Sequence, residues 1–170
     1  MQIIELITTG GTIEKAYSEQ SGAVLNSASK IGLYLKRLRL PGCNVRVVPL
    51  LNKDSLEMTA EDRAGLVSVM GLLLGEGNPI VITHGTDTMV ETGVYIQKAF
   101  PQLQVPIVLT GAMTPLGFEG SDGLQNLTES LLAARLLGPG VFVVMHGQVF
   151  PADRVRKNRE QATFESAIPA

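Results

Sequence analysis

The sequence predicts one α/β domain over residues 1–170, with three layers in which helices cover both faces of a mostly parallel sheet. Short apolar runs have the composition of buried strands, and helical patterns lie between most of them. Strand and helix alternate along the chain without a linker, repeat or low-complexity segment. The predicted strands are Ile3–Thr8, Val45–Leu51, Ile80–Thr83, Val105–Thr110 and Val141–Met145. Their order within the sheet stays undetermined.

The first predicted strand ends at two glycines, and a long polar segment follows it. Gly10 and Gly11 form a bend whose backbone can lie against a ligand. Residues 13–27 show no sustained periodicity, and a structureless loop of that length is typically functional. A helix is then predicted over Ser29–Leu40, because apolar residues share one face and Pro41-Gly42 ends the pattern.

Three further helices are predicted from capping residues and apolar spacing. Thr59 and Asp62 resemble a capping box at the start of the second helix. The third begins after Thr88, the predicted cap, and carries Gly93 on its buried face, where it would allow close packing on the sheet. The fourth is marked by apolar residues between Leu124 and Ala134. The polar stretch 148–170 predicts no helix.

The composition excludes several classes of partner. Of 170 residues, 45% are hydrophobic and 18% are charged, with a net charge of −2, so neither a nucleic acid nor a membrane surface is indicated. No run approaches the ~18 apolar residues of a membrane span, and no signal peptide is visible. Cys43 is the single cysteine and allows no internal disulfide. These features predict a cytoplasmic protein.

Several common motifs are missing. Glycine spacing fits neither a dinucleotide fingerprint nor a P-loop, and the serine elbow of α/β-hydrolases is absent. His84, His146 and Cys43 are too few and too far apart in sequence to predict a metal site. Both histidines follow strands, and we expect them to be hydrogen-bonded supporting groups rather than catalysts.

Polar residues gather instead where the predicted parallel strands end. Thr12, Ser55, Thr86 with Asp87, and Ala112 all follow strands, so they should lie along one edge of the sheet, where α/β folds bind ligands. A hydroxyl nucleophile needs a base, and a lysine with a lowered pKa is one candidate. The alternative is that Thr86, Asp87 and Thr88 only cap the next helix.

Two of these segments resemble the signature motifs of the bacterial-type L-asparaginase family. They are Thr8–Ile13 (TTGGTI) and Thr83–Met89 (THGTDTM). The resemblance continues at shorter motifs along essentially the whole chain, namely 54–55, 111–113, 121–127, 143–145, 153–157 and 162–164. It implies the flavodoxin- or Rossmann-like fold of the family's N-terminal domain.

The resemblance also implies roles for individual residues. Thr12 matches the nucleophilic threonine, and Thr86, Asp87 and Lys157 match the second catalytic group, with Tyr17 as the tyrosine of the flexible loop. The substrate would be bound by Ser55 at its α-carboxylate, by Asp87 at its α-amino group, and by the backbone around Ala112 at its side-chain amide. Gly11, Gly85 and Thr86 complete the implied binding set.

The implied reaction converts L-asparagine to L-aspartate and ammonia through an acyl group on Thr12, with no metal or organic cofactor. Leu56 stands where several relatives have glutamine, so L-glutamine is expected to be the poorer substrate. Family members are about twice as long, and this sequence ends about where their linker begins, so it resembles either a short single-domain form or a fragment. In the longer members the second domain of a neighbouring subunit adds an acidic residue to the pocket, and we expect that contribution to be absent here or replaced. We therefore expect a more open site and weaker substrate binding. By resemblance we also expect a homo-oligomer, since the family usually forms tetramers.

Two other functions fit the same motifs. One is the ammonia-releasing, asparaginase-like subunit of a tRNA-dependent amidotransferase, although the chain has no added domain and little net charge. The other is a non-catalytic module that binds asparagine. The presence of Thr12, Thr86, Asp87 and Lys157 together disfavours this second alternative.

Overall fold

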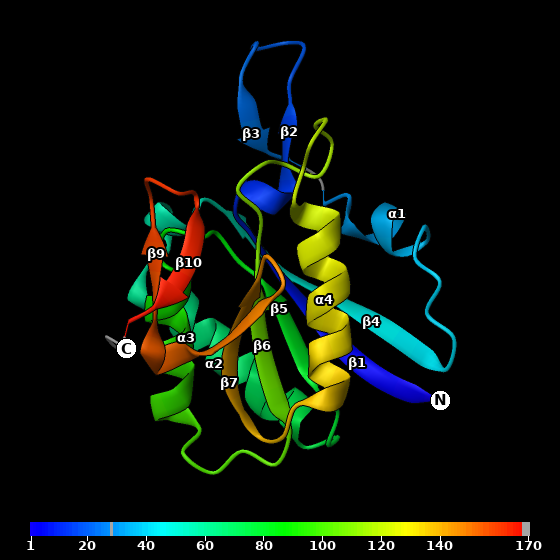
Figure 1. Cartoon of the computed structure of the whole chain (residues 1–170), viewed down its shortest axis with the longest axis vertical. Coiled ribbons are helices and arrows are strands. Elements are labelled where there is room, and N and C mark those ends of the chain that lie inside the picture. The colour runs from blue at the N-terminus through cyan, green and yellow to red at the C-terminus, as the bar shows by residue number, and fades with distance from the viewer. Residues whose placement is uncertain (28, 168–170) are drawn as a thin grey trace.

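The computed structural model describes residues 1–27 and 29–167, and a six-stranded sheet forms its centre (Figure 1). The strand order is β4-β1-β5-β6-β7-β8. The first five strands run parallel to one another, and β8 pairs antiparallel with β7 at the edge. The bounds are β1 Gln2–Gly10, β4 Cys43–Lys53, β5 Ile80–Thr83, β6 Pro106–Thr110, β7 Gly140–Met145 and β8 Gln148–Pro151.

Helices cover both faces of this sheet, which confirms the predicted three-layer α/β architecture (Figure 1). Ile7 of β1 packs in the apolar cluster that contains residues of α2 and α3, whereas its neighbour Leu6 lies in the cluster that contains residues of α1 and α4. Successive strand side chains point to opposite faces, so β1 contributes to both clusters. The bounds are α1 Ile31–Leu35, α2 Ala60–Leu74, α3 Met89–Ala99 and α4 Gly123–Leu136. Among the described residues, none of the helices has the length and apolar composition needed to cross a bilayer.

The strand order predicts that a ligand would bind next to β1. The chain crosses from β1 to β4 on one side, and the next strand, β5, lies on the other side of β1. In open α/β sheets, ligands bind at the carboxyl ends of the strands where the connections change direction. The loops after β1 and β5 therefore flank the expected site, and these are the loops that carry Thr12 and Thr86.

Two details of helix packing follow the sequence. Thr59 and Asp62 form the predicted capping box, since each side chain accepts a hydrogen bond from the other residue's backbone N–H. A Cβ at Gly93 would lie 2.9 Å from Ala152 Cβ and 3.6 Å from Leu109 Cδ1. Gly93 lies on the buried face of α3, as expected, but the close approach that it allows is to Ala152 of the short helix η3 (Ala152–Arg154), whereas Leu109 of β6 is at ordinary contact distance.

Other predicted elements differ from the structure. The segment 13–27 is not structureless, because the short helix η1 (Thr12–Glu14) and the antiparallel hairpin of β2 (Lys15–Tyr17) and β3 (Val24–Asn26) lie within it. This hairpin extends beyond the body of the molecule (Figure 1). The first helix covers only Ile31–Leu35, since it contains Gly32, lacks a side-chain cap and fully buries only Ile31.

The polar stretch after β7 has no α-helix in its described part, as expected, but it forms strands. After β8 and the short helix η3 (Ala152–Arg154), β9 (Val155–Asn158) and β10 (Thr163–Ser166) make an antiparallel hairpin. Residues 168–170 of this stretch lie outside the described residues. Backbone pairing joins the two strands, and each buries one apolar residue, Val155 or Phe164, in the core cluster that contains residues of α2 and α3. One apolar residue in a four-residue strand gives no periodicity that would predict it.

Candidate active site

Three of the predicted turns touch one another at the carboxyl end of the sheet. A Cβ added to Gly11 would lie 2.3 Å from the backbone nitrogen of Gly85, and Gly11 has a positive φ of 76°. A Cβ added to Gly85 would lie 2.5 Å from the Oγ of Ser55. Glycine is therefore required at both turns, because any side chain would separate them. The structure thus brings the loops after β1, β4 and β5 into contact.

Thr86 and Asp87 are joined to Lys157, which β9 brings to the site. Lys157 Nζ donates to Thr86 Oγ1 at 2.7 Å and lies 3.0 Å from Asp87 Oδ1. Thr86 is buried and Lys157 is largely buried. A hydroxyl, an amine and a carboxylate in hydrogen-bond reach can move a proton between them.

Asp87 has a second cationic partner that the sequence analysis does not single out. Arg159 NH1 lies 2.7 Å from Asp87 Oδ1, the same oxygen that contacts Lys157. The Arg159 side chain is 69% exposed, so solvent weakens this ion pair. Arg159 lies in the turn after β9, and nothing in the sequence around it indicates Asp87 as its partner.

Ser55 has a buried hydroxyl that no other described residue satisfies. Ser55 is 2% exposed, and its Oγ has no hydrogen-bond partner among the described residues. The preceding Asp54 caps the short helix η2 (Ser55–Glu57) by accepting from Leu56 N at 3.1 Å. A hydrogen bond from Lys15 at 2.6 Å is the main cause that lowers the pKa of Asp54. A buried, unpaired hydroxyl is available for a ligand oxygen.

Thr88 connects the loops after β4 and β5 in a way that the sequence does not predict. It occupies the N-cap position of α3, as expected, but its side chain makes no capping hydrogen bond. Its hydroxyl instead donates to the Ser55 carbonyl at 2.9 Å. The prediction of a capping side chain is therefore wrong, because the hydroxyl ties two site loops together.

The loop after β6 places Ala112 beside the other turns. Ala112 is buried, and a Cβ at Gly111 would lie 2.4 Å from the His84 carbonyl oxygen and 3.4 Å from Thr86 Cγ2. Asp122 accepts from the backbone of Met113 at 3.0 Å and holds this loop.

A second network of hydrogen bonds, around Asp122 and His146, holds the loop after β6. Burial opposes the charge of Asp122, but hydrogen bonds from Met113, His146 and the Thr114 backbone outweigh it and hold its pKa below the usual value. His146 Nε2 lies 2.8 Å from Asp122 Oδ2, and its Nδ1 lies 3.0 Å from Thr163 Oγ1 on β10. The expectation that His146 is hydrogen-bonded is confirmed, and its partners link this loop to the hairpin that carries Lys157.

Thr12 and Tyr17 are held less firmly. Thr12 begins η1 and is half-buried, and its hydroxyl makes no hydrogen bond to another described residue. Tyr17 lies on the β2–β3 hairpin with 59% of its surface exposed. Asn26 of the same hairpin donates to the Gly11 carbonyl at 3.0 Å, which anchors the base of the hairpin to the glycine turn. The structure does not join Tyr17 by a hydrogen bond to Thr86 or Lys157.

Glu14 is a buried carboxyl group beneath the same turn, and the sequence analysis does not identify it. Its Oε2 accepts from Gly10 N at 2.8 Å, and burial is the main cause that raises its pKa. Nothing in the sequence around Glu14 marks it as a buried carboxyl group.

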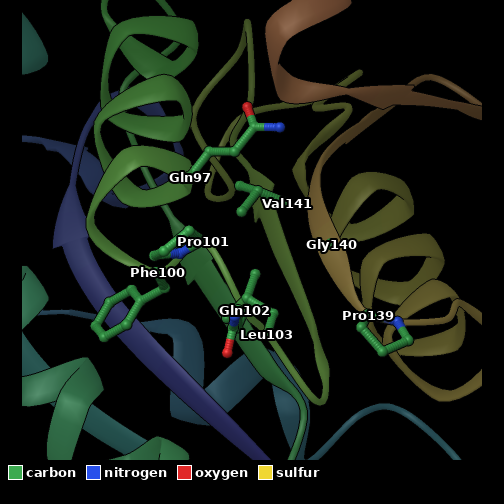
Figure 2. A pocket seen from close by; sticks show the side chains of 8 residues that line it. All are labelled: Gln97, Phe100, Pro101, Gln102, Leu103, Pro139, Gly140 and Val141. Atoms are coloured by element: carbon green, nitrogen blue, oxygen red, sulfur yellow. The ribbon is translucent and has the colours of Figure 1, made fainter.

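One cavity of the described chain lies away from the candidate site and has no charged lining. A cavity of about 300 Å³ opens at the far end of the sheet, where β7 begins (Figure 2). Its lining contains no charged residue: Gln97, Phe100, Pro101, Gln102, Leu103, Pro139, Gly140 and Val141. Among the described residues, no group of three or more His, Cys, Asp or Glu side chains is placed to hold a metal.

Comparisons with known proteins agree with the sequence motifs. The family model described as "Asparaginase, N-terminal" matches residues 3–168. The L-asparaginase of Thermococcus kodakarensis is 32% identical over 152 residues, which are 89% of this chain and 46% of that protein. The solved structure of this thermostable enzyme superposes with a TM-score of 0.84 at 30% identity, covering 97% of this chain and 51% of that one.

Two more relatives carry different names. A Haemophilus influenzae protein, named a probable periplasmic L-asparaginase, is 34% identical over 96% of this chain and 49% of its own length. A glutamyl-tRNA(Gln) amidotransferase subunit from Methanococcus vannielii is 30% identical over 86% of this chain and 34% of its own length. The chain spans about half the length, or less, of these curated relatives. With the family model matched over nearly its whole length, the chain belongs to the asparaginase family and corresponds to its N-terminal domain.

Proposed function

We propose that this chain hydrolyses the side-chain amide of L-asparagine through an acyl-enzyme on Thr12. The observation that carries the proposal is the hydrogen-bonded group of Lys157, Thr86 and Asp87, next to the contact between the Gly11 and Gly85 turns. Thr12 is half-buried and directly follows Gly11, and this adjacency supports the proposal that it acts together with the Lys157–Thr86–Asp87 group. A nucleophile and a positioned proton carrier are the minimum for amide hydrolysis through a covalent intermediate.

The proposed reaction has two halves. Thr12 Oγ forms a bond to the amide carbon, and the carbon–nitrogen bond breaks to release ammonia. The hydroxyl proton of Thr12 passes through the Lys157–Thr86–Asp87 group to the leaving nitrogen. Water then attacks the ester carbon, its proton returns to Thr12 Oγ, and L-aspartate leaves. Every proton is accounted for, and the reaction needs no metal or organic cofactor.

Substrate binding follows from the polar groups around the turns. The free Ser55 hydroxyl is available for the α-carboxylate, and the backbone near Ala112 for the side-chain amide. The α-ammonium would bind Asp87, whose Oδ1 already contacts Lys157 and Arg159. Because this carboxylate is shared between cations, we expect a weak affinity for asparagine. An acidic residue from a second domain, as in longer relatives, is not part of the proposed site.

The remaining features of the proposal concern context. Leu56 is 68% exposed beside Ser55 and offers no amide to a longer substrate, so glutamine should react more slowly. We propose that the chain assembles as a homo-oligomer, a state that light scattering measures. The cytoplasm is the proposed compartment, on the basis of the single, disulfide-free Cys43.

The test is ammonia release from asparagine and glutamine by the purified chain alone. We expect release with asparagine preferred, loss of release in Thr12→Ala, and partial activity in Thr12→Ser, which keeps the hydroxyl. Comparable rates on the two substrates would overturn the preference. Full activity in Thr12→Ala would overturn the role of that residue.

The relative named as an amidotransferase subunit favours a second candidate function. An ammonia-supplying subunit would release little ammonia alone and more when its partner and charged tRNA are present. Robust release by the isolated chain would exclude that alternative.

A further inference from the structure

A buried chain of hydrogen bonds leads from helix α2 to the turn that carries Thr86. Arg63 Nε donates to Thr92 Oγ1 at 3.1 Å, and Thr92 Oγ1 lies 2.8 Å from His84 Nε2. His84 Nδ1 lies 2.7 Å from the Gly85 carbonyl oxygen. Arg63 is 6% exposed, and both Thr92 and His84 are fully buried.

The direction of each hydrogen bond in this chain is fixed by its chemistry. The Gly85 carbonyl can only accept, so His84 carries its proton on Nδ1. His84 Nε2 must then accept, which makes the Thr92 hydroxyl the donor. Thr92 Oγ1 in turn accepts from Arg63, which has no acceptor atom. Burial lowers the pKa of His84 to about 4, which agrees with a neutral ring.

Two further contacts of the guanidinium group hold Arg63 in place at the α2 end of this hydrogen-bond network. Arg63 NH1 donates to the Met58 carbonyl at 3.3 Å, and its NH2 lies 3.3 Å from Glu91 Oε1. Burying an arginine is costly unless its donors are paired. The burial of Arg63 next to His84 and Thr92 therefore calls for an explanation other than core packing, since an apolar residue would fill the same space.

We propose that these three buried side chains position the peptide between Gly85 and Thr86 for catalysis. The Gly85 carbonyl sets the orientation of that peptide, and with it the direction of the Thr86 N–H and side chain. Gly85 lies between the Gly11 turn and Ser55, so a rotation here would displace both partners. Arg63, Thr92 and His84 do not touch the reacting atoms, and they act through Thr86. This inference rests on the proposed function.

The test compares Thr92→Val with Thr92→Ser. Valine has nearly the shape of threonine but leaves Arg63 Nε and His84 Nε2 without partners, whereas serine keeps the hydroxyl. We expect Thr92→Val to lower kcat for asparagine by about 10- to 100-fold with little change in KM, as small displacements of catalytic groups do. Thr92→Ser should restore most of kcat. Ser130→Ala, which removes a buried hydroxyl that donates to a carbonyl of α4, should leave kcat unchanged.

Nuclear magnetic resonance separates this inference from the proposed function. The ¹⁵N signals of His84 should show the proton on Nδ1, and the Thr86 amide signal should shift in Thr92→Val but not in Thr92→Ser. If the wild-type protein releases no ammonia, the proposed function fails. The shift of the Thr86 amide signal still decides whether Arg63, Thr92 and His84 position the turn. A proton on Nε2, an unchanged Thr86 signal, or wild-type kcat in a folded Thr92→Val protein would overturn the inference.

Discussion

Thr86 and Thr12 follow neighbouring strands of one sheet, yet the structure holds their side chains in different ways. The Thr86 hydroxyl accepts a hydrogen bond from Lys157, and buried side chains support the turn from below. The Thr12 hydroxyl has no partner among the described residues, and Tyr17 lies exposed on a projecting hairpin. The residues proposed to handle protons are thus hydrogen-bonded to one another, whereas the hydroxyl of the proposed nucleophile, Thr12, is not hydrogen-bonded within the part of the chain that the structure describes.

The difference has a physical basis in burial. The β5 strand is buried along its length, and the turn after it contacts Gly11, Ser55 and Gly111. The β2–β3 hairpin is two-stranded, and its residues are half-buried or exposed. An isolated two-stranded hairpin is marginally stable, so we expect the Tyr17 side to move on ligand binding and the Thr86 side to stay fixed.

The largest expected effect comes from removing the Thr86 hydroxyl or the Lys157 amine. Thr86→Val and Lys157→Met should each lower kcat for asparagine by about 100- to 10,000-fold, because proton transfer by a positioned group contributes that much. The double variant should lose little more than either single variant, since the two side chains act as one unit. Steady-state ammonia release measures this. Near-normal turnover in either single variant would refute its role.

The next effect concerns the stability of the protein in acid, which depends on the buried His84. His84 has a pKa of about 4 in the folded protein and an ordinary value of 6.5. Between these values the unfolded chain binds a proton that the folded chain does not, so stability falls as pH falls. From pH 7 to pH 4 the free energy of unfolding should lose about 3 kcal/mol through His84.

Urea unfolding at several pH values tests this effect. Glu14 acts in the opposite direction, because its raised pKa favours the folded state as pH falls. The informative quantity is therefore the difference between the wild-type chain and His84→Gln. A wild-type curve that parallels that of His84→Gln between pH 7 and pH 4 would contradict the prediction.

A smaller effect is expected from Tyr17, which is exposed on the β2–β3 hairpin. Tyr17→Phe removes a hydroxyl that is solvated in the free protein, so its melting temperature should not change. If the hairpin closes over bound substrate, kcat/KM should fall by about 2- to 12-fold, the equivalent of one hydrogen bond. Tyr34→Phe, on α1, is the matched control. Equal kinetics for Tyr17→Phe and the wild-type chain would show that the hairpin does not contribute.

The smallest expected effect concerns Arg159, an exposed residue that forms an ion pair with Asp87. Arg159→Gln removes a cation that competes with the substrate's α-ammonium group at Asp87. Exposed ion pairs contribute little, so KM for asparagine should fall only about 2- to 5-fold while kcat stays constant. Arg156→Gln, whose partner is Glu165 rather than Asp87, is the control. A rise in KM would mean that Arg159 binds the substrate rather than competing with it.

Much of the fold was predictable because the central strands are continuous apolar runs and their turns contain glycine. The same residues indicated where the polar groups of the site would meet. The β2–β3 and β9–β10 hairpins were not predictable, since backbone pairing and not apolar pattern defines them. Lys157 lies 71 residues after Thr86, so only the resemblance, and not local sequence, connected the two. Arg159 and Glu14 needed coordinates, because nothing in their sequence neighbourhood specifies a partner.

Mass spectrometry during turnover can identify which threonine carries the acyl group. The wild-type protein is mixed with asparagine and the reaction is quenched in acid during turnover. The protein is then digested, and the masses of its peptides are measured by mass spectrometry. We predict a transient aspartyl adduct on the peptide that contains Thr12, absent from Thr12→Ala. An adduct on the peptide that contains Thr86 instead would contradict the account.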